Sequence, residues 1–358
     1  MLVDLSESFV VIALLLFVFL WRVGKASAID NYSSMAIENT AALRGAFSII
    51  ILLHHLSGYI NNITFLFPLR YCGYVIVAYF FFFSGYGLTW GICKKTNYLK
   101  RFLIKRIPKI YIPYLISVIV YALYGYFFNN TAPTVKQVLL SLVCIDSISL
   151  LGWYIGALIL MYIIFYISAK ISPAYRTAAF WIMFAAVYIA LFLAPVAEEF
   201  TRSLIGFPLG IYFCIYQKKI EEALRKKYIL YFIIGIAGTV SGFAVKWFGE
   251  EKNIGIIKLC GNVVSCAFSI LVLIIIINKF RFGNKILAVF GALSFEVYLY
   301  HKLFLELFYK FELFQAHCLL FFLATVISTL VFAYLISLLD NGIGRAINNY
   351  FRRKDESS

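Results

Sequence analysis

The residues that most suggest chemistry are an arginine and a histidine, Arg44 and His55, in one apolar stretch at residues 41–60. Eleven residues of α-helix rise about 16 Å and make close to three turns, so both side chains would project from nearly the same face. His54 would lie about 100° away around the helix and cannot share that role. Ionisable groups inside a bilayer cost about 2.5–3.5 kcal/mol each on insertion scales, so they indicate a functional site. The pair would hold an anionic ligand at Arg44 and present an imidazole deeper in the protein, unless it only makes polar contacts between helices.

A second candidate is a basic segment at residues 94–109. Ten residues separate Lys94 from Lys105, and ten separate Lys95 from Arg106. Clustered cations suit a polyphosphate ligand or anionic lipid head groups. Basic loops also set the orientation of membrane helices, so this segment alone does not establish a binding site.

A third group of polar residues lies late in the chain, within residues 291–301. Ser294, Tyr298 and His301 follow an i, i+4, i+7 spacing and would share one helix face, whereas Glu296 would lie elsewhere on the circumference. Polar groups in a membrane must find partners, so this segment predicts either a polar site or hydrogen bonds between helices.

Two further segments carry small or aromatic residues. Ser84 lies in Phe-Phe-Phe-Ser-Gly-Tyr-Gly at residues 81–87, and Trp153 precedes a tyrosine at residues 153–154. Small residues allow helices to approach closely in membranes, so packing alone would explain both segments.

Composition places these candidates in a membrane protein. The chain is 63% hydrophobic and 14% charged, against about 25% charged residues in a typical soluble chain. The net charge of +15 lies in short connectors between apolar runs, which argues against nucleic-acid binding. The seven cysteines form no CxxC motif and the four histidines lack zinc-finger spacing, so we expect no metal site.

The hydrophobic runs predict an all-α, polytopic transmembrane bundle of ten core helices plus one extra N-terminal apolar helix. The expected helices lie near residues 9–22, 41–60, 73–93, 107–128, 149–169, 176–194, 203–217, 228–247, 256–277, 286–308 and 316–338. The run at 203–217 is short and contains glycine and proline, which indicates a tilted or broken helix. Acidic residues before the first run argue against a signal peptide.

The cations predict the orientation of these helices. Most of the 32 lysines and arginines fall in alternate connectors, including residues 94–109, residues 218–227 and the tail. The positive-inside rule assigns these connectors to the cytoplasm. The C-terminus would then be cytoplasmic.

These segments together resemble acyltransferase family 3, the integral membrane enzymes that acylate surface polysaccharides and related glycans. The resemblance rests on Arg44-x10-His55, the Phe-Phe-x-x-Ser-Gly-Tyr segment, the basic segment running to Pro113, Trp153-Tyr154, and Ser294 through His301. It implies an acyltransferase membrane domain at 41–340, preceded by an extra helix and connector at 1–40 and followed by a basic cytoplasmic tail at 341–358.

The resemblance also implies a mechanism. A short acyl group, acetyl by default, would pass from acetyl-CoA to a sugar hydroxyl, with His55 as the general base. Arg44 would contact the donor's phosphates or acyl carbonyl, and the cations Lys94, Lys95, Lys105 and Arg106 would attract its nucleotide end. Pocket-lining residues would be Ser84, Trp153, Glu296, Tyr298 and His301. No permanently bound cofactor is expected; the partners would be acyl-CoA, a glycan or lipid-linked oligosaccharide, and membrane lipids, in a bacterial inner membrane.

Two other classes of protein fit the residues. Buried arginine, histidine and glutamate in a helix bundle also suit a transporter of a lipid-linked sugar or an anion. A structural partner in a glycan-assembly complex would use the same residues only for packing.

Overall fold

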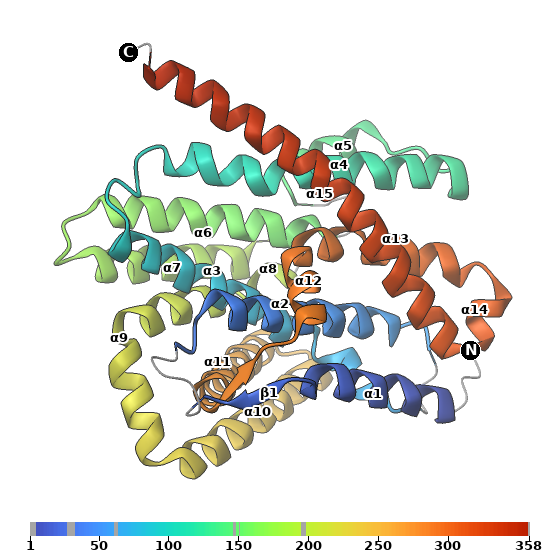
Figure 1. Ribbon diagram of the computed structural model, residues 1–358, viewed down its shortest axis with the longest axis horizontal. Helices are drawn as coiled ribbons and strands as arrows, with labels where there is room; N and C mark the ends of the chain where they lie inside the picture. Colours follow the sequence, from blue (N-terminus) through green and yellow to red (C-terminus); the bar gives the residue numbers. More distant parts are fainter. Residues whose placement is uncertain are drawn as a thin grey trace. The chain divides into compact units, whose positions relative to one another are not determined.

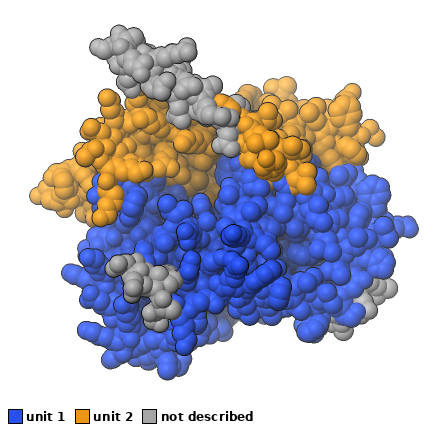
Figure 2. All heavy atoms as spheres, viewed as in Figure 1, with its two compact units in different colours: residues 1–93, 201–330 blue, residues 94–200, 331–358 orange. Residues whose placement is uncertain are grey.

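The structure is a computed structural model that describes residues 5–26, 33–60, 64–145, 148–149, 151–194 and 198–356. Its described part is almost entirely helical (Figure 1). The chain divides into two compact units, unit 1 with residues 1–93 and 201–330 and unit 2 with residues 94–200 and 331–358 (Figure 2). Each unit is therefore assembled from segments far apart in the sequence.

Unit 1 contains most of the described helices and both short strands. Its elements are α1 (Leu5–Leu20), β1 (Val23–Lys25), α2 (Ile37–Leu56), η2 (Phe67–Tyr71), α3 (Gly73–Lys94), α8 (Glu199–Arg202), α9 (Gly206–Lys226), α10 (Tyr228–Glu251), α11 (Gly255–Lys279), β2 (Phe280–Phe282), α12 (Lys285–Ala292), α13 (Ser294–Tyr309), α14 (Glu312–Ala316) and the start of α15 (Cys318–Glu356). Unit 2 contains α4 (Phe102–Asn129), α5 (Val135–Leu142), α6 (Gly152–Lys170), α7 (Arg176–Leu193) and the rest of α15.

Seven described helices are long and apolar enough to cross a membrane: α3, α4, α6, α7, α10, α11 and residues Cys318–Asp340 of α15. This confirms the predicted polytopic helical bundle. Each of the eleven predicted segments contains a helix, but α1, α2 and α9 are not among the seven. In α2 the reason is polar residues, since Glu38, Arg44 and two histidines interrupt its apolar sequence.

The prediction of one continuous helix at 286–308 is wrong. This segment forms two helices, α12 and α13, that bend by 81° across the break. Leu293 leaves helical geometry at φ −101° and ψ 11°, and the Ser294 hydroxyl donates to the Gly291 carbonyl at 3.0 Å. This side-chain bond satisfies a carbonyl at the end of α12, which stabilises the interruption. If the pair counts as one span, the described chain contains up to eight.

Two glycines bring α2 and α12 into direct backbone contact. A Cβ atom on Gly45 would overlap the Leu287 carbonyl, and one on Gly291 would overlap the Ala41 carbonyl. Helices that approach this closely gain dispersion contacts along their whole crossing, as in other membrane interfaces with small residues. The crossing fixes where α13 starts relative to α2.

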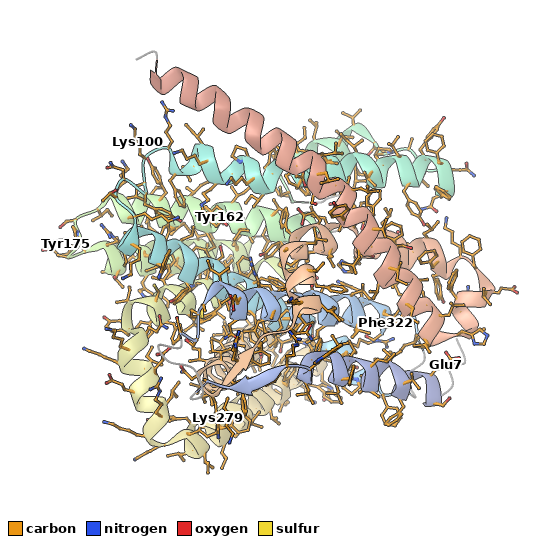
Figure 3. The ribbon with its side chains drawn as sticks, in the orientation of Figure 1. Glu7, Lys100, Tyr162, Tyr175, Lys279 and Phe322 are labelled. Atoms are coloured by element: carbon orange, nitrogen blue, oxygen red, sulfur yellow. The ribbon has the colours of Figure 1, made fainter. Side chains whose placement is uncertain are left out.

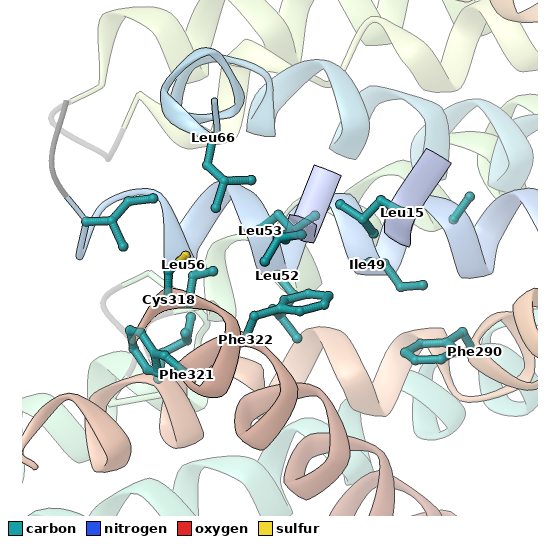
Figure 4. Packing of buried hydrophobic residues seen from close by; sticks show 14 of the residues in the cluster. Leu15, Ile49, Leu52, Leu53, Leu56, Leu66, Phe290, Cys318, Phe321 and Phe322 are labelled. Atoms are coloured by element: carbon teal, nitrogen blue, oxygen red, sulfur yellow. The ribbon is translucent and has the colours of Figure 1, made fainter. Parts of the chain in front are cut away.

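The extra N-terminal helix α1 is part of the core of unit 1. Its Val11 and Leu15 pack in one buried cluster with residues of α2, α12 and α15 (Figure 4). At its N-terminal end, Glu7 accepts hydrogen bonds from His317 Nδ1 at 3.0 Å and from the Leu319 backbone N–H at 3.1 Å (Figure 3). Beyond its other end, β1 pairs antiparallel with β2.

Unit 2 is held together by aromatic packing and backbone hydrogen bonds. The Phe102 ring stacks on Tyr166 at 5.9 Å between centroids and packs against Tyr162 at 6.1 Å, which joins α4 to α6. The Tyr114 hydroxyl donates to the Ser141 carbonyl at 2.6 Å and joins α4 to α5.

Candidate active site

Two histidines that the sequence places in separate motifs meet in unit 1. The rings of His55 on α2 and His301 on α13 lie 5.0 Å apart between centroids, with an angle of 35° between their planes. The contact depends on the glycine crossing of α2 and α12, because α13 leaves from the end of α12. Two imidazoles in contact form a polar centre within an otherwise apolar core.

The backbone fixes the tautomer of His301. This side chain is fully buried, and its Nδ1 lies 2.9 Å from the Val297 carbonyl oxygen. A carbonyl oxygen can only accept, so Nδ1 donates and a neutral ring carries its lone pair on Nε2. Among the described residues Nε2 has no hydrogen-bond partner. Tyr298 borders the same ring, at 6.2 Å between centroids.

His54 serves a different structural purpose from its neighbour. Its Nδ1 donates to the Leu69 carbonyl in η2 at 3.0 Å, and its ring fills the space that a Cβ atom on Gly73 would need. His54 therefore fastens α2 to η2 and to the start of α3. Its ring also contacts His55 at 4.7 Å between centroids and restricts where that imidazole can lie.

Arg44 and Glu296 both lie close to the break between α12 and α13. Arg44 is half-buried and directly precedes Gly45, where α2 touches α12. Glu296 is half-buried in the first turn of α13, where the helix dipole favours a negative charge. Ser294, the first residue of that helix, is buried and uses its hydroxyl to stabilise the break.

The aromatic segment around Ser84 packs against α2. Phe47, one turn beyond Arg44, contacts the rings of Tyr79, Phe80 and Phe83 at 4.7, 6.3 and 6.2 Å. Ser84 follows these residues on α3 and is half-buried.

A hydrogen-bonded cluster that sequence reasoning missed joins α3 to α9 and to Ser34 before α2. The Tyr86 hydroxyl donates to Gln217 Oε1 at 2.7 Å, and Gln217 Nε2 donates to Glu221 Oε1 at 2.9 Å. The Ser34 hydroxyl donates to the same Glu221 oxygen at 2.7 Å. These partners lie up to 187 residues apart, and no spacing in the sequence signals them.

Six of the predicted site residues belong to unit 1: Arg44, His55, Ser84, Glu296, Tyr298 and His301. The other five belong to unit 2. Lys94, Lys95 and Lys105 are exposed. Arg106 is half-buried, and its guanidinium donates to the Tyr98 hydroxyl at 2.7 Å. Trp153 is half-buried in the first turn of α6.

Sequence reasoning also misses Lys302, which is half-buried directly after His301. Charge patterning alone assigns this lysine to a connector between helices. Its spacing of four residues from Glu306, on the same helix face, is the available signal.

Within the described ranges, no group of three or more histidine, cysteine, aspartate or glutamate side chains is arranged to hold a metal ion.

The fold and this polar centre define a multi-pass membrane protein with ionisable groups inside its helix bundle. A family model for the acyltransferase domain, Acyl_transf_3, matches residues 39–338. The chain therefore belongs to acyltransferase family 3. The match includes both histidine motifs and excludes α1. No curated protein and no solved structure matches the chain.

Proposed function

We propose that this membrane acyltransferase transfers a short acyl group, acetyl by default, from acyl-CoA to a sugar hydroxyl of a cell-surface or lipid-linked glycan. Family membership supports acyl transfer in general. The observation that carries the more specific proposal is the contact between His55 and the buried His301. A sugar hydroxyl is a weak nucleophile that needs a base, and imidazole is suited to that task at neutral pH.

In the proposed reaction His55 is the base. The sugar oxygen attacks the thioester carbonyl carbon while His55 takes the hydroxyl proton. The tetrahedral intermediate then collapses, the carbon–sulfur bond breaks, and the departing thiolate of CoA takes a proton from the His55 imidazolium. The products are the sugar ester and free CoA.

His301 is proposed as a positioning residue for His55. The Nδ1–H of His301 donates to the Val297 carbonyl, so the Nε2 atom of His301 carries a lone pair that can accept a hydrogen bond. Such a lone pair would favour the orientation of His55 in which a ring N–H points at it. In other histidine sites a second residue likewise sets the tautomer and orientation of the catalytic imidazole by a hydrogen bond.

The donor would be held by cations. Arg44 would contact the phosphates or the acyl carbonyl of the donor, since a guanidinium donates paired hydrogen bonds to such oxygens. Lys94, Lys95, Lys105 and Arg106 would attract the nucleotide end. Ser84, Trp153, Glu296 and Tyr298 would line the pocket. The protein would lie in a bacterial inner membrane with its C-terminus in the cytoplasm.

The test is release of free thiol from acetyl-CoA by purified protein, with a glycan extract from the source cells. We expect His55→Ala to lose about 10²–10⁴-fold in rate, the usual contribution of a general base. The matched control is His317→Ala, which removes a histidine that is half exposed and bonded to Glu7. If His55→Ala keeps the wild-type rate while the protein remains folded, His55 is not the base.

One observation favours a transporter as a second candidate. The α12–α13 pair is a helix broken by 81°, and broken helices form the ion and substrate sites of many transporters. Proteoliposomes separate the two functions: uptake of a lipid-linked sugar or an anion without thiol release would support the transporter.

A further inference from the structure

A basic hollow lies where α9 meets α10, within unit 1. It has a volume of about 260 Å³ and is lined by Lys219, Glu222, Ala223, Lys226, Lys227 and Tyr231. Three lysines and one glutamate thus line a space large enough for a small anionic group, and the lining carries a net positive charge. No part of the proposed acyl transfer uses these residues.

Local backbone geometry brings the lysines together. Helical geometry in α9 is interrupted at Tyr216, with φ −108° and ψ 15°, and the helix then continues to Lys226. Lys219 and Lys226 lie seven residues apart, close to two turns, so they share one helix face. Lys227 lies between the two helices with φ −135° and ψ 46°, where the chain turns into α10.

A further cation lies at the same junction. Lys279, at the end of α11, places its ammonium 3.8 Å from the centroid of the Tyr228 ring, in a cation–π contact with the first residue of α10 (Figure 3). Its charge adds to the positive potential around the start of α10.

The hollow borders an apolar surface. The helix α10 is one of the seven that are long and apolar enough to cross a membrane. Only 11% of its most apolar stretch is buried inside the protein. Leu230 and Ile234 lie three and seven residues after Lys227, on its side of α10, and they are 49% and 40% exposed. The same helix therefore offers cations at its start and hydrocarbon-compatible side chains along its length.

We propose that this hollow binds the headgroup of an anionic phospholipid, whose acyl chains lie along the exposed face of α10. The charge of the hollow complements a phosphate group, and basic pockets beside membrane helices suit such lipids. The adjoining apolar face selects a lipid over a soluble phosphate, because only a lipid buries hydrocarbon there. The predicted cytoplasmic side of residues 218–227 faces the leaflet where negative surface potential attracts lysine. This site is independent of the proposed acyl transfer.

The test is native mass spectrometry of the full chain in detergent, to which phosphatidylglycerol or phosphatidylcholine is added. The measured quantity is the fraction of protein that retains each lipid after release from the detergent. The first variant is Lys219→Ala/Lys226→Ala/Lys227→Ala. The matched control is Lys218→Ala/Arg225→Ala/Lys285→Ala, which removes three exposed cations of the same unit that do not line the hollow. Thermal unfolding of each variant without lipid checks that it is folded.

We expect the wild type to retain phosphatidylglycerol in preference to phosphatidylcholine. The lining variant should bind phosphatidylglycerol roughly tenfold or more weakly, since all three lysines that attract the anionic headgroup are removed. The control should change less than about twofold. Equal losses in both variants would overturn the proposal in favour of diffuse attraction. Loss of CoA or inorganic phosphate binding in the lining variant, with phosphatidylglycerol binding intact, would overturn it in favour of a soluble anion.

A second variant avoids dependence on a triple substitution. Tyr231→Phe removes one hydroxyl from the wall of the hollow and keeps the ring. Lipid binding should weaken only slightly, by about two- to fivefold, if that hydroxyl donates to the headgroup. If phosphatidylglycerol binds Tyr231→Phe as tightly as the wild type, and the lysine variant loses no more than its control, the proposal is overturned.

Discussion

Two helix pairs in unit 1, α10–α11 and α2–α12, both pack closely, but only the second pair leads into the candidate site. In the α10–α11 pair, a Cβ atom on Gly242 would overlap the backbone of Ser265, just as one on Gly45 would overlap α12. The α10–α11 helices run unbroken, however, and the Lys258–Glu250 ion pair between them is partly exposed. The α2–α12 pair ends at a break, and α13 then brings a buried histidine against His55. Close packing alone therefore does not make a site; the interruption of one helix does.

Gly291→Leu should have the largest effect on activity. The new side chain cannot fit against the Ala41 carbonyl, so α12 must move away from α2 and carry α13 with it. We expect more than about a 10²-fold loss of thiol release per folded molecule. Gly242→Leu in the α10–α11 pair should lower the melting temperature and leave the rate per folded molecule within about threefold. If Gly291→Leu and Gly242→Leu release thiol at similar rates per folded molecule, the α2–α12 pair has no special role in activity.

His301→Ala should lower kcat by about 10- to 100-fold with little change in KM, because a positioning residue acts on the base rather than on substrate binding. His301→Asn can still donate to the Val297 carbonyl but lacks the ring and its Nε2 lone pair. If His301→Asn restores the wild-type rate, the residue only anchors the helix. Rates and unfolding of the two variants, measured side by side, decide this.

Asn284→Ala should lower stability by about 1–2 kcal/mol. The Asn284 side chain accepts from the Ile286 and Leu287 backbone N–H groups and donates to the Val18 carbonyl at 2.6 Å. It thus caps α12 and ties that helix to α1. Denaturant unfolding measures the loss, and Lys285→Ala, at an exposed position of the same helix, is the comparison.

Glu250→Gln should have the smallest effect. Glu250 pairs with Lys246 at 3.4 Å within α10 and with Lys258 of α11 at 3.6 Å, and it is 38% exposed. Partly exposed ion pairs contribute about 0.2–1 kcal/mol, so unfolding should shift by that amount and acyl transfer should not change. A large loss of activity would show that the α10–α11 pair takes part in the reaction.

The fold class and the two histidines could be predicted from the sequence because each depends on local pattern. Apolar runs of sufficient length predict membrane helices, and an ionisable residue inside such a run is conspicuous. The break at Leu293 could not be predicted, because the apolar character of residues 286–308 continues across it. Without the break, nothing indicates that His301 reaches His55.

The role of α1 is equally hidden in the sequence. The partners of α1 and of the β1 strand after it are distant along the chain: Glu7 bonds His317, and Val23 of β1 pairs with Phe282. Neither contact leaves a periodic signal near residues 5–25, because pairing across such separations is decided by the assembled fold. The basic residues at 94–109 are recognisable from charge alone, which indicates an orientation but not a ligand.

The separation of α2 from α12 along the chain has a consequence for biosynthesis. Residue 56 leaves the ribosome about 230 residues before residue 285, which at 5–20 residues per second is a delay of roughly 10–50 s. During that interval Arg44 and His55 lie in a nascent helix whose face around Gly45 has no α12 to cover it. Lipid, other helices of the same chain or an insertion chaperone must therefore shield this face until α12 is synthesised.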